Sequence, residues 1–330
     1  MTKQKRQIAL IHGGRGAEHN VSLLGAEYVM SILDREKYGI LPILIERDGR
    51  WIFEGGEVYP ICFGGVSGLY NGETILPVDC AIPLLHGEFG EDGRIQGALD
   101  TAGIPYVGSD TVAGGVCMDK GLTRAIARAH GIPTAQGIAL PRHADIDDAR
   151  AAAESIGYPI FIKPTRQGSS IGASAVWEED ELPTAFARAA LYGAVLIEEL
   201  VTDKREVEIG ILAHKGRHTV SPLGEVLCHG FYDYNKKYGS ATKAVCPADI
   251  DDRTAEKIQK YALTLCTAID VRGPLRIDFF ISGGRLLFNE INTMPGMTET
   301  SLYFRLLESH GISAREATSR LISDAIGGAL

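Results

Sequence analysis

The chain begins with a strand, a glycine turn and a helix, and this pattern restricts the fold more than any other feature. Residues 7–12 form a short apolar run that ends in Gly13 and Gly14, and residues 20–37 then carry apolar side chains at helical spacing. The alternation continues in two strand-like runs and one helical stretch: 40–45, 80–85 and 95–101. Such alternation is typical of a parallel α/β sheet. We therefore predict an N-terminal parallel α/β domain over residues 1–108.

The rest of the sequence predicts two further domains. Two strand-like runs, 159–163 and 173–177, flank a glycine- and serine-rich loop, and helical stretches are predicted at 118–130 and 182–192. Longer strand-like runs and two helical stretches follow: 195–198, 207–213, 252–269, 274–281, 286–291 and 314–326. We predict a small central α+β domain at 109–193 and a sheet-based C-terminal domain at 194–330, so the fold class is α/β and α+β.

The charge balance excludes several classes of partner. The 33 Lys+Arg residues against 42 Asp+Glu residues give a net charge of −9, which disfavours a nucleic-acid surface or an anionic membrane as partner. No apolar run approaches the ~20 residues that span a bilayer, so we predict a cytoplasmic protein. The 6 cysteines lie far apart without a C-x-x-C pair, which favours reduced thiols over zinc ligands.

The first glycine cluster does not match a dinucleotide-binding motif. Gly14 and Gly16 have the spacing of G-x-G-x-x-G, but His19 stands where the third glycine would be, so a dehydrogenase is disfavoured. Glu18 lies at the expected helix start. It either complements the helix dipole or directs a carboxylate at a substrate ammonium group, and the residues alone leave both interpretations open.

A second cluster runs from Lys163 through Gly168 to Gly172. It offers a lysine at the end of a strand, followed by the hydroxyl and backbone N–H donors of Ser169 and Ser170. Such a loop can surround phosphate groups, although the sequence is not a P-loop. A simple hairpin turn remains the alternative.

Two neighbouring strands carry the third constellation. Arg276 and Asp278 share one face of the first strand, and Glu290 and Asn292 share one face of the second. In an antiparallel hairpin, Asp278 and Glu290 lie on the same face only if the connecting loop has an odd number of residues, so we predict a three-residue loop at 283–285. The resulting oxygen ligands would suit Mg²⁺; an ordinary solvated strand face is the alternative.

Aromatic and lysine residues are concentrated at 229–239, where no strand or helix period is visible. We predict a lid loop at 229–246, in which Lys237 and Tyr238 could close over an anionic transition state and exclude water. An ordinary surface excursion is the alternative.

Taken in order, these segments resemble the D-alanine:D-alanine ligases of the ATP-grasp superfamily, from about residue 8 to residue 326. The strings that carry the resemblance are Gly13-Gly14 with Ala17-Glu18 and Val21-Ser22, His86-Gly87 with Gly90-Glu91-Asp92-Gly93, Met118-Asp119-Lys120, Lys163-Pro164 with Gly168-Ser169-Ser170, Phe231-Tyr232 with Lys237-Tyr238, Arg276-Ile277-Asp278, and Asn289-Glu290-Ile291-Asn292-Thr293 with Pro295-Gly296.

The resemblance implies a two-step ligation for peptidoglycan precursor synthesis. ATP phosphorylates the carboxylate of one D-alanine, and the amine of a second D-alanine attacks the acyl phosphate. The implied cofactors are ATP and two Mg²⁺ ions, which Mn²⁺ could replace, and the implied assembly is a homodimer.

The resemblance also implies residue roles on the nucleotide side. The expected ATP contacts are Lys120, Lys163, Ser169, Ser170, Glu198, Leu200, Val201, Glu206, Phe231 and Lys237. The expected metal ligands are Asp278, Glu290 and Asn292.

On the amino-acid side, the resemblance implies that Glu18 anchors the first ammonium group with His86 nearby. Ser301 and Lys237 would receive the second carboxylate beside Leu302.

The expected oxyanion hole consists of Arg276 and the N–H of Gly296. Tyr238 would lock the lid by hydrogen bonds with Ser169 and Glu18.

Three alternatives remain at this level. The acceptor could be D-serine, or the chain could be another ATP-grasp carboxylate-amine ligase, because a fold alone does not fix the substrate. A nucleotide-binding regulator without turnover is disfavoured, since binding alone does not require an oxyanion hole. The pair Lys237-Tyr238 favours an amine acceptor over D-lactate.

Overall fold

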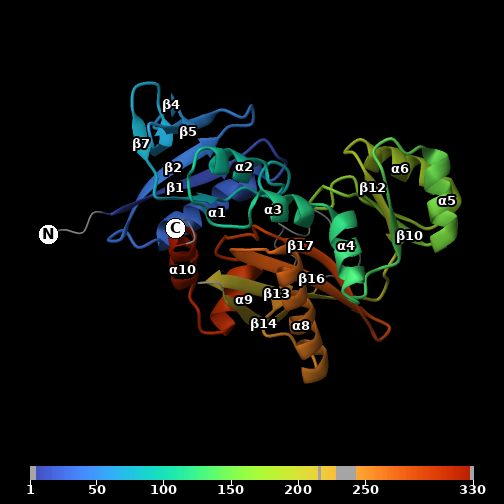
Figure 1. The fold of residues 1–330 in the computed structure, drawn as a ribbon. Coiled ribbons are helices and arrows are strands. Elements are labelled where there is room, and N and C mark those ends of the chain that lie inside the picture. Colours follow the sequence, from blue (N-terminus) through green and yellow to red (C-terminus); the bar gives the residue numbers. More distant parts are fainter. Residues whose placement is uncertain (1–4, 215–216, 228–242, 328–330) are drawn as a thin grey trace.

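The computed structural model describes residues 5–214, 217–227 and 243–327, and the strands in these ranges form four sheets (Figure 1). The blue N-terminal sheet and the orange and red C-terminal elements lie next to each other, while α5 and α6 lie at the far end of the molecule. Among the described residues, no helix is long and apolar enough to cross a membrane.

The N-terminal sheet is built around β1 (Arg6–Gly13), which pairs in parallel with β2 (Tyr38–Ile45) on one side and β8 (Cys80–Pro83) on the other. Helix α1 (His19–Ile32) follows β1 after the glycine turn, and α2 (Arg94–Thr101) follows β8. The α/β class is therefore confirmed.

The N-terminal sheet also has an antiparallel edge, which the prediction of a parallel α/β domain did not include. β3 (Trp51–Phe53) and β4 (Gly56–Glu57) extend the sheet in antiparallel pairing. The reason is the short connection after β2, because a tight turn reverses the chain, whereas a parallel neighbour needs a long crossover. A separate three-stranded sheet follows in β5 (Tyr59–Phe63), β6 (Val66–Tyr70) and β7 (Ile75–Pro77).

The second unit is an antiparallel four-stranded sheet in the order β11-β10-β12-β9. Its strands are β9 (Gly137–Leu140), β10 (Ile160–Pro164), β11 (Ser174–Val176) and β12 (Val195–Glu199). Its helical elements are α5 (Ile146–Ile156), η1 (Glu179–Glu181) and α6 (Leu182–Ala190). The domain boundaries at 109 and 194 remain predictions, and β12, which follows the second one, completes this sheet.

The C-terminal sheet has five strands in the order β15-β14-β13-β16-β17. The strands are β13 (Arg205–His214), β14 (Arg217–Leu227), β15 (Lys243–Val245), β16 (Pro274–Ser282) and β17 (Arg285–Asn292). The helices that follow or interrupt them are α8 (Asp252–Ile269), α9 (Leu302–Ser309) and α10 (Ala314–Gly327). Residues 229–242 of the predicted lid lie outside the described ranges.

The helix predicted at 118–130 is α4 (Lys120–Ala129), and a helix that was not predicted, α3 (Thr111–Met118), directly precedes it. Asp119 separates them in an extended conformation, and its side chain accepts hydrogen bonds from the N–H groups of Gly121 and Leu122, so it caps α4. Both helices pack on the C-terminal sheet and share its hydrophobic core. This packing places Lys120, the first residue of α4, beside β17.

A second core joins the two ends of the chain. Strand β1 and helix α1 of the N-terminal sheet bury their side chains together with those of α9 and α10. The residues that meet there include Ile8, Leu10, Val29, Tyr303, Phe304, Leu307 and Leu321. Met294 and Met297 belong to the same core, so the loop between β17 and α9 packs against α1.

The register between β16 and β17 places Asp278 opposite Glu290, as expected, but not for the expected reason. Ser282 pairs with Arg285, so the turn contains only Gly283 and Gly284 and the predicted three-residue loop is wrong. With that turn alone, Asn289 would face Asp278. A β-bulge at Asn289 adds the missing residue and shifts Glu290 onto the face of Asp278.

Candidate active site

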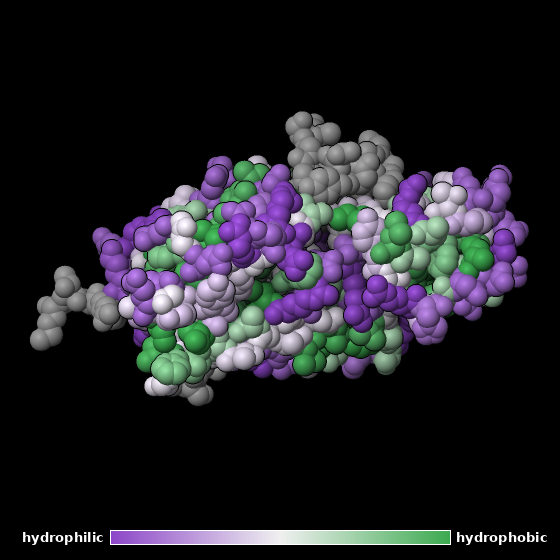
Figure 2. Space-filling view, turned by 90° about the horizontal axis from the view of Figure 1, so that it is seen from above, coloured by the Kyte–Doolittle hydropathy of each residue, from purple (hydrophilic) through white to green (hydrophobic). Residues whose placement is uncertain are grey.

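The N-terminal sheet, the four-stranded sheet and the C-terminal sheet, together with their helices, enclose a cleft. The cleft has two adjoining parts of about 1040 Å³ and about 140 Å³. The two parts share Lys120, Ser169, Glu208, Arg276 and Glu290 in their walls. Figure 2 shows hydrophilic side chains gathered on the two lobes beside the hollow in the middle of the molecule. The cleft therefore combines a roomy part with a narrow one, and charged side chains line both.

The structure brings every described residue of the predicted site to this cleft. The predicted residues that line only the larger part are Glu18, His86, Asn292, Gly296, Ser301 and Leu302. The predicted residues that line only the smaller part are Lys163, Ser170, Glu198, Leu200, Val201, Glu206 and Asp278. The shared wall holds Lys120, Ser169, Arg276 and Glu290. Phe231, Lys237 and Tyr238 lie outside the described residues.

Glu18 directly precedes α1 and is 8% exposed. Its Oε1 accepts a hydrogen bond of 2.6 Å from the hydroxyl of Ser169, a residue 151 positions away. Gly87 approaches the same carboxylate so closely that a Cβ there would lie 2.6 Å from Oε2. Both residues were expected to bond to Tyr238, which lies outside the described residues, and Glu18 presents a carboxylate to the larger part of the cleft.

Glu91 and His86 hold the loop that follows β17. The two oxygens of Glu91 accept hydrogen bonds of 2.9 Å from the N–H groups of Gly87 and Met294, and Nδ1 of His86 lies 2.9 Å from the Met294 carbonyl oxygen. Burial raises the pKa of Glu91. These contacts fix the peptide group two residues before Gly296, and Nε2 of His86 has no hydrogen-bond partner among the residues that the structure describes.

Arg276 lies between two carboxylates. Its Nε and Nη2 donate hydrogen bonds of 2.8 Å each to the two oxygens of Asp278, and Nε is 3.1 Å from an oxygen of Glu208. Burial lowers the pKa of Arg276, but the two carboxylates outweigh that effect and raise it well above its ordinary value. Arg276 is thus a permanently charged group in the shared wall of the cleft.

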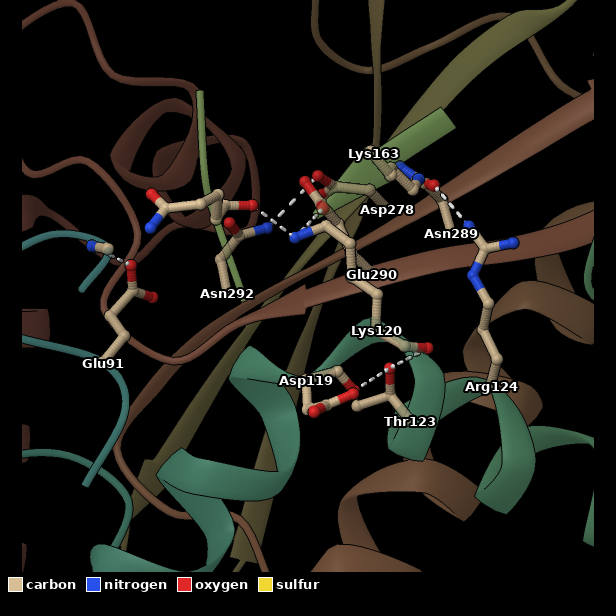
Figure 3. A network of polar contacts seen from close by, with 12 residues as sticks. Glu91, Asp119, Lys120, Thr123, Arg124, Lys163, Asp278, Asn289, Glu290 and Asn292 are labelled. Atoms are coloured by element: carbon tan, nitrogen blue, oxygen red, sulfur yellow. Dashed lines mark hydrogen bonds and ion pairs between the residues drawn. The ribbon is translucent and has the colours of Figure 1, made fainter. Parts of the chain in front are cut away.

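The carboxylate and amide groups of Asp278, Glu290 and Asn292 lie close to one another (Figure 3), and Asp278 is the one that Arg276 contacts. The amide of Asn292 donates to Asp278 at 3.2 Å, and Glu290 lies 3.5 Å from the Lys120 ammonium group. Among the described residues, no group of three or more His, Cys, Asp or Glu side chains is arranged to hold a metal ion unaided. This donor set fits Mg²⁺, which is commonly bound by one or two carboxylates together with water and substrate phosphate oxygens.

Lys163 lies at the end of β10 with a side chain that is 12% exposed. Its Nζ is 2.8 Å from Oε1 of Glu198, whose Oε2 forms an ion pair with Arg124. Burial lowers the pKa of Lys163 to about 8, Glu198 partly opposes that effect, and the neighbouring cations Arg124 and Lys120 add to it. The pKa of Glu198 is lowered, because the two cations outweigh the effect of burial.

The glycine- and serine-rich loop lies between these groups. The Lys120 ammonium donates a 2.7 Å hydrogen bond to the Gln167 carbonyl oxygen. Ser169 and Ser170 have φ values of 51° and 58°, a left-handed conformation that is unusual for residues with a side chain. The contact from Lys120 on α4 and the contact from Glu18 before α1 hold the loop in this conformation beside the narrow part of the cleft.

The sequence prediction omitted three charged site residues: Glu91, Arg124 and Glu208. Glu208 has a signal in the sequence, because it lies two positions after Glu206 and so shares its face of β13. Glu91 belongs to a string that supported the resemblance but received no role. Arg124 lies one helical turn after Lys120, which places both on one face of α4.

Comparison with known proteins agrees with this geometry. The family described as D-ala D-ala ligase C-terminus matches residues 126–323, and the family described as D-ala D-ala ligase N-terminus matches residues 7–63 and 62–109. The chain belongs to the D-alanine–D-alanine ligase family. Members of this family are ligases, so the chain is an enzyme.

Full-length relatives support this membership. The D-alanine–D-alanine ligase of Deinococcus radiodurans is 40% identical over 338 residues, which cover 98% of this chain and 99% of the relative. The corresponding enzyme of Thermoanaerobacter sp. is 36% identical over 349 residues, which cover 98% and 97%.

Two solved structures have the same fold. The D-alanine–D-alanine ligase from Coxiella burnetii matches with a TM-score of 0.89 and 27% identity, covering 99% of this chain and 95% of the other. The VanG D-Ala:D-Ser ligase from Enterococcus faecalis matches with a TM-score of 0.87 and 32% identity, covering 99% and 100%.

Proposed function

We propose that the chain joins two D-alanine molecules to D-alanyl-D-alanine, with ATP converted to ADP and phosphate, in the supply of peptidoglycan precursors. The observation that carries the proposal is the cleft itself: the carboxylate of Glu18 and the guanidinium of Arg276 both line its wide part, and Arg276 also lines the adjoining narrow part. The γ-phosphoryl group passes to a carboxylate oxygen of the first D-alanine. The second amine then attacks the carbonyl carbon and phosphate leaves.

The narrow part of the cleft suits the nucleotide. Lys120 and Lys163 would hold its phosphates, with Ser169 and Ser170 over the γ-phosphate. Glu198, Leu200 and Val201 would line the adenine side, and Glu206, whose carboxylate lies 2.9 Å from the Lys204 ammonium, would meet the ribose. Phosphoryl transfer needs positioning and charge compensation more than covalent help, and these residues supply both.

Asp278, Glu290 and Asn292 would hold two Mg²⁺ ions. Bound there, the ions would offset the negative charge that develops during phosphoryl transfer. The residues themselves supply three oxygen-bearing side chains on one face of a hairpin, while Lys120 and Arg276 compensate the carboxylates.

The wide part of the cleft suits the amino acids. Glu18 would anchor the first ammonium group, with His86 beside it, and Ser301, next to Leu302, would receive the second carboxylate. Arg276 and the N–H of Gly296 would stabilise the oxyanion of the tetrahedral intermediate. Glu91 and His86 would keep that N–H in place through Met294.

The nucleotide affinity should depend on pH through Lys163. Its pKa is lowered to about 8, so the ammonium group that attracts phosphate is present below that pH and is lost as the pH rises through it. We expect the affinity for the non-hydrolysable analogue AMP-PNP to fall between about pH 7 and pH 9, as measured by calorimetry. A Lys163→Arg variant should abolish this fall, and an unchanged decline in that variant would contradict the assignment.

The substrate assignment predicts a simple pattern of phosphate release. With Mg²⁺ and ATP, D-alanine should stimulate release strongly, whereas L-alanine and D-lactate alone should not, since the first site must phosphorylate a D-amino acid. Release is measured with each compound in turn, and the product is identified by mass spectrometry. Release that no D-amino acid affects would reject the proposed function.

D-serine is the second candidate for the acceptor, because the VanG D-Ala:D-Ser ligase has the same fold at 32% identity. Equimolar D-alanine and D-serine in one reaction decide between the two. The proposal expects D-alanyl-D-alanine to be the main product, and predominant D-alanyl-D-serine would select the alternative. The homodimer and the cytoplasmic location remain predictions.

A further inference from the structure

Arg124 is the most deeply buried charged residue of the cleft region, with a side chain that is 1% exposed. It projects from α4 toward Asn289 of β17 (Figure 3), to whose Oδ1 its Nη2 donates a 3.2 Å hydrogen bond. It also forms an ion pair with Glu198 of β12. Burying an arginine is costly unless its charge is compensated, so these two partners determine where it lies.

The first partner concerns charge. Glu198 carries one negative charge and contacts two cations, Lys163 and Arg124, so the cluster of three has a net charge of +1. Without Arg124, the single carboxylate would be matched by Lys163 alone. The lysine charge would then be compensated inside the protein and would no longer be available to an anionic ligand.

The second partner concerns register. Asn289 is the bulged residue of β17, and the bulge is what brings Glu290 opposite Asp278 despite the two-residue turn. The amide of Asn289 accepts its hydrogen bond from Arg124, so the guanidinium fixes the bulge from the neighbouring helix. One buried side chain thus contacts both the nucleotide cluster and the strand that carries Glu290.

We propose that Arg124 is a positioning residue for nucleotide binding: it pairs with Glu198, so that this carboxylate does not fully offset the positive charge that Lys163 presents to the phosphates, and it holds Asn289 in the bulge that sets the position of Glu290. The inference rests on the proposed function, since it assumes that the narrow part of the cleft binds a nucleotide. Arg124 itself touches neither phosphate nor metal.

Calorimetric binding of AMP-PNP tests the charge role without turnover. In the absence of Mg²⁺, Arg124→Met should weaken binding by about 10- to 100-fold, the range seen when partners of ligand-binding residues are removed. Arg128→Met is the matched control, because Arg128 lies one turn further along α4 and is exposed. Arg124→Lys restores the charge and should recover most of the Mg²⁺-free affinity. Equal binding by wild type and Arg124→Met, or no recovery in Arg124→Lys, would overturn the charge role.

The register role has a separate readout. Asn289→Ala should leave Mg²⁺-free AMP-PNP binding close to that of the wild type and reduce the gain in affinity that Mg²⁺ gives. An unchanged gain would overturn this half of the proposal. Thermal unfolding is recorded for each variant, and if Arg124→Met does not fold, Arg124→Lys and Asn289→Ala carry the test, since both keep the buried charges balanced.

The pH profile separates positioning from a purely structural role. Charged groups face Lys163 from three elements: Glu198 of β12, Arg124 and Lys120 of α4, and Glu290 of β17. Because Arg124 lowers the pKa of Lys163, Arg124→Met should move the alkaline loss of AMP-PNP binding to higher pH even though binding is weaker. A midpoint that stays in place would contradict the proposal. Failure of the wild type to bind AMP-PNP would instead reject the proposed function.

Discussion

Glu290→Gln is expected to reduce Mg²⁺-dependent ADP formation by about 100-fold or more, the scale of losing an electrostatic group from a catalytic site. Glutamine keeps the shape of the side chain and one oxygen, but it removes the negative charge that a hard cation prefers. It also leaves the Lys120 ammonium, 3.5 Å away, without its carboxylate partner on β17. Both changes weaken the compensation of charge at the phosphates.

ADP formation is measured with saturating D-alanine over a series of Mg²⁺ concentrations. The wild type and Glu256→Gln should behave alike, because Glu256 is exposed on α8 away from the cleft. Glu290→Gln should need more Mg²⁺ and reach a lower maximal rate. If its rate and its Mg²⁺ requirement both equal those of the control, Glu290 is not a metal ligand.

Glu18→Gln is expected to raise the KM for the first D-alanine by about 100-fold, since losing one partner of a buried charge pair costs about 2–5 kcal/mol. The glutamine oxygen can still accept the hydrogen bond from Ser169, so the loop over the nucleotide should keep its position. The variant therefore removes the charge that would attract the ammonium group while leaving the contact between the two units.

A matched control lies on the same helix. Glu27 is exposed, lines the wide part of the cleft and belongs to α1, so Glu27→Gln changes a neighbouring charge of the same kind. Initial rates over a range of D-alanine concentrations should show a raised first-site KM in Glu18→Gln only, with unchanged AMP-PNP affinity. An equal first-site KM in both variants would remove Glu18 from the ammonium site.

The elements that the sequence predicted well are those with a long regular period. The 18 residues of α8 were expected at the bounds observed, and the buried strands β1 and β16 stand out as apolar runs. The helices α3, α5 and α9 and the strands β3 to β7, β9, β14 and β15 were not predicted. Short strands such as β4, with two exposed residues, have no apolar face, so their pairing depends on neighbours that the local sequence does not reveal.

The candidate site was predictable where chemistry and spacing coincide. Arg276 and Asp278 share a face because they are two positions apart in a strand, and the structure keeps them 2.8 Å apart. The relation between Asp278 and Glu290 was correct only because a bulge at Asn289 replaced the odd loop. A bulge is stabilised by tertiary contacts, here a hydrogen bond from Arg124 on another element, and local sequence patterns do not contain such contacts.

The same reason explains the residues that were missed. Glu91 bonds to Met294, 203 positions further on, and Arg124 bonds to Asn289, 165 positions further on. A buried charged side chain is recognised only when its partner is known, because an isolated arginine in an amphipathic helix is usually read as solvent-exposed.

The transfer of an oxygen atom tests the central claim most directly. D-alanine labelled with ¹⁸O in its carboxylate is incubated with the chain, ATP and Mg²⁺, and the released phosphate is analysed by mass spectrometry. If the carboxylate attacks the γ-phosphorus and the second amine then displaces phosphate, each phosphate carries one ¹⁸O atom for each dipeptide formed. Phosphate without ¹⁸O, formed together with D-alanyl-D-alanine, would contradict the acyl-phosphate route.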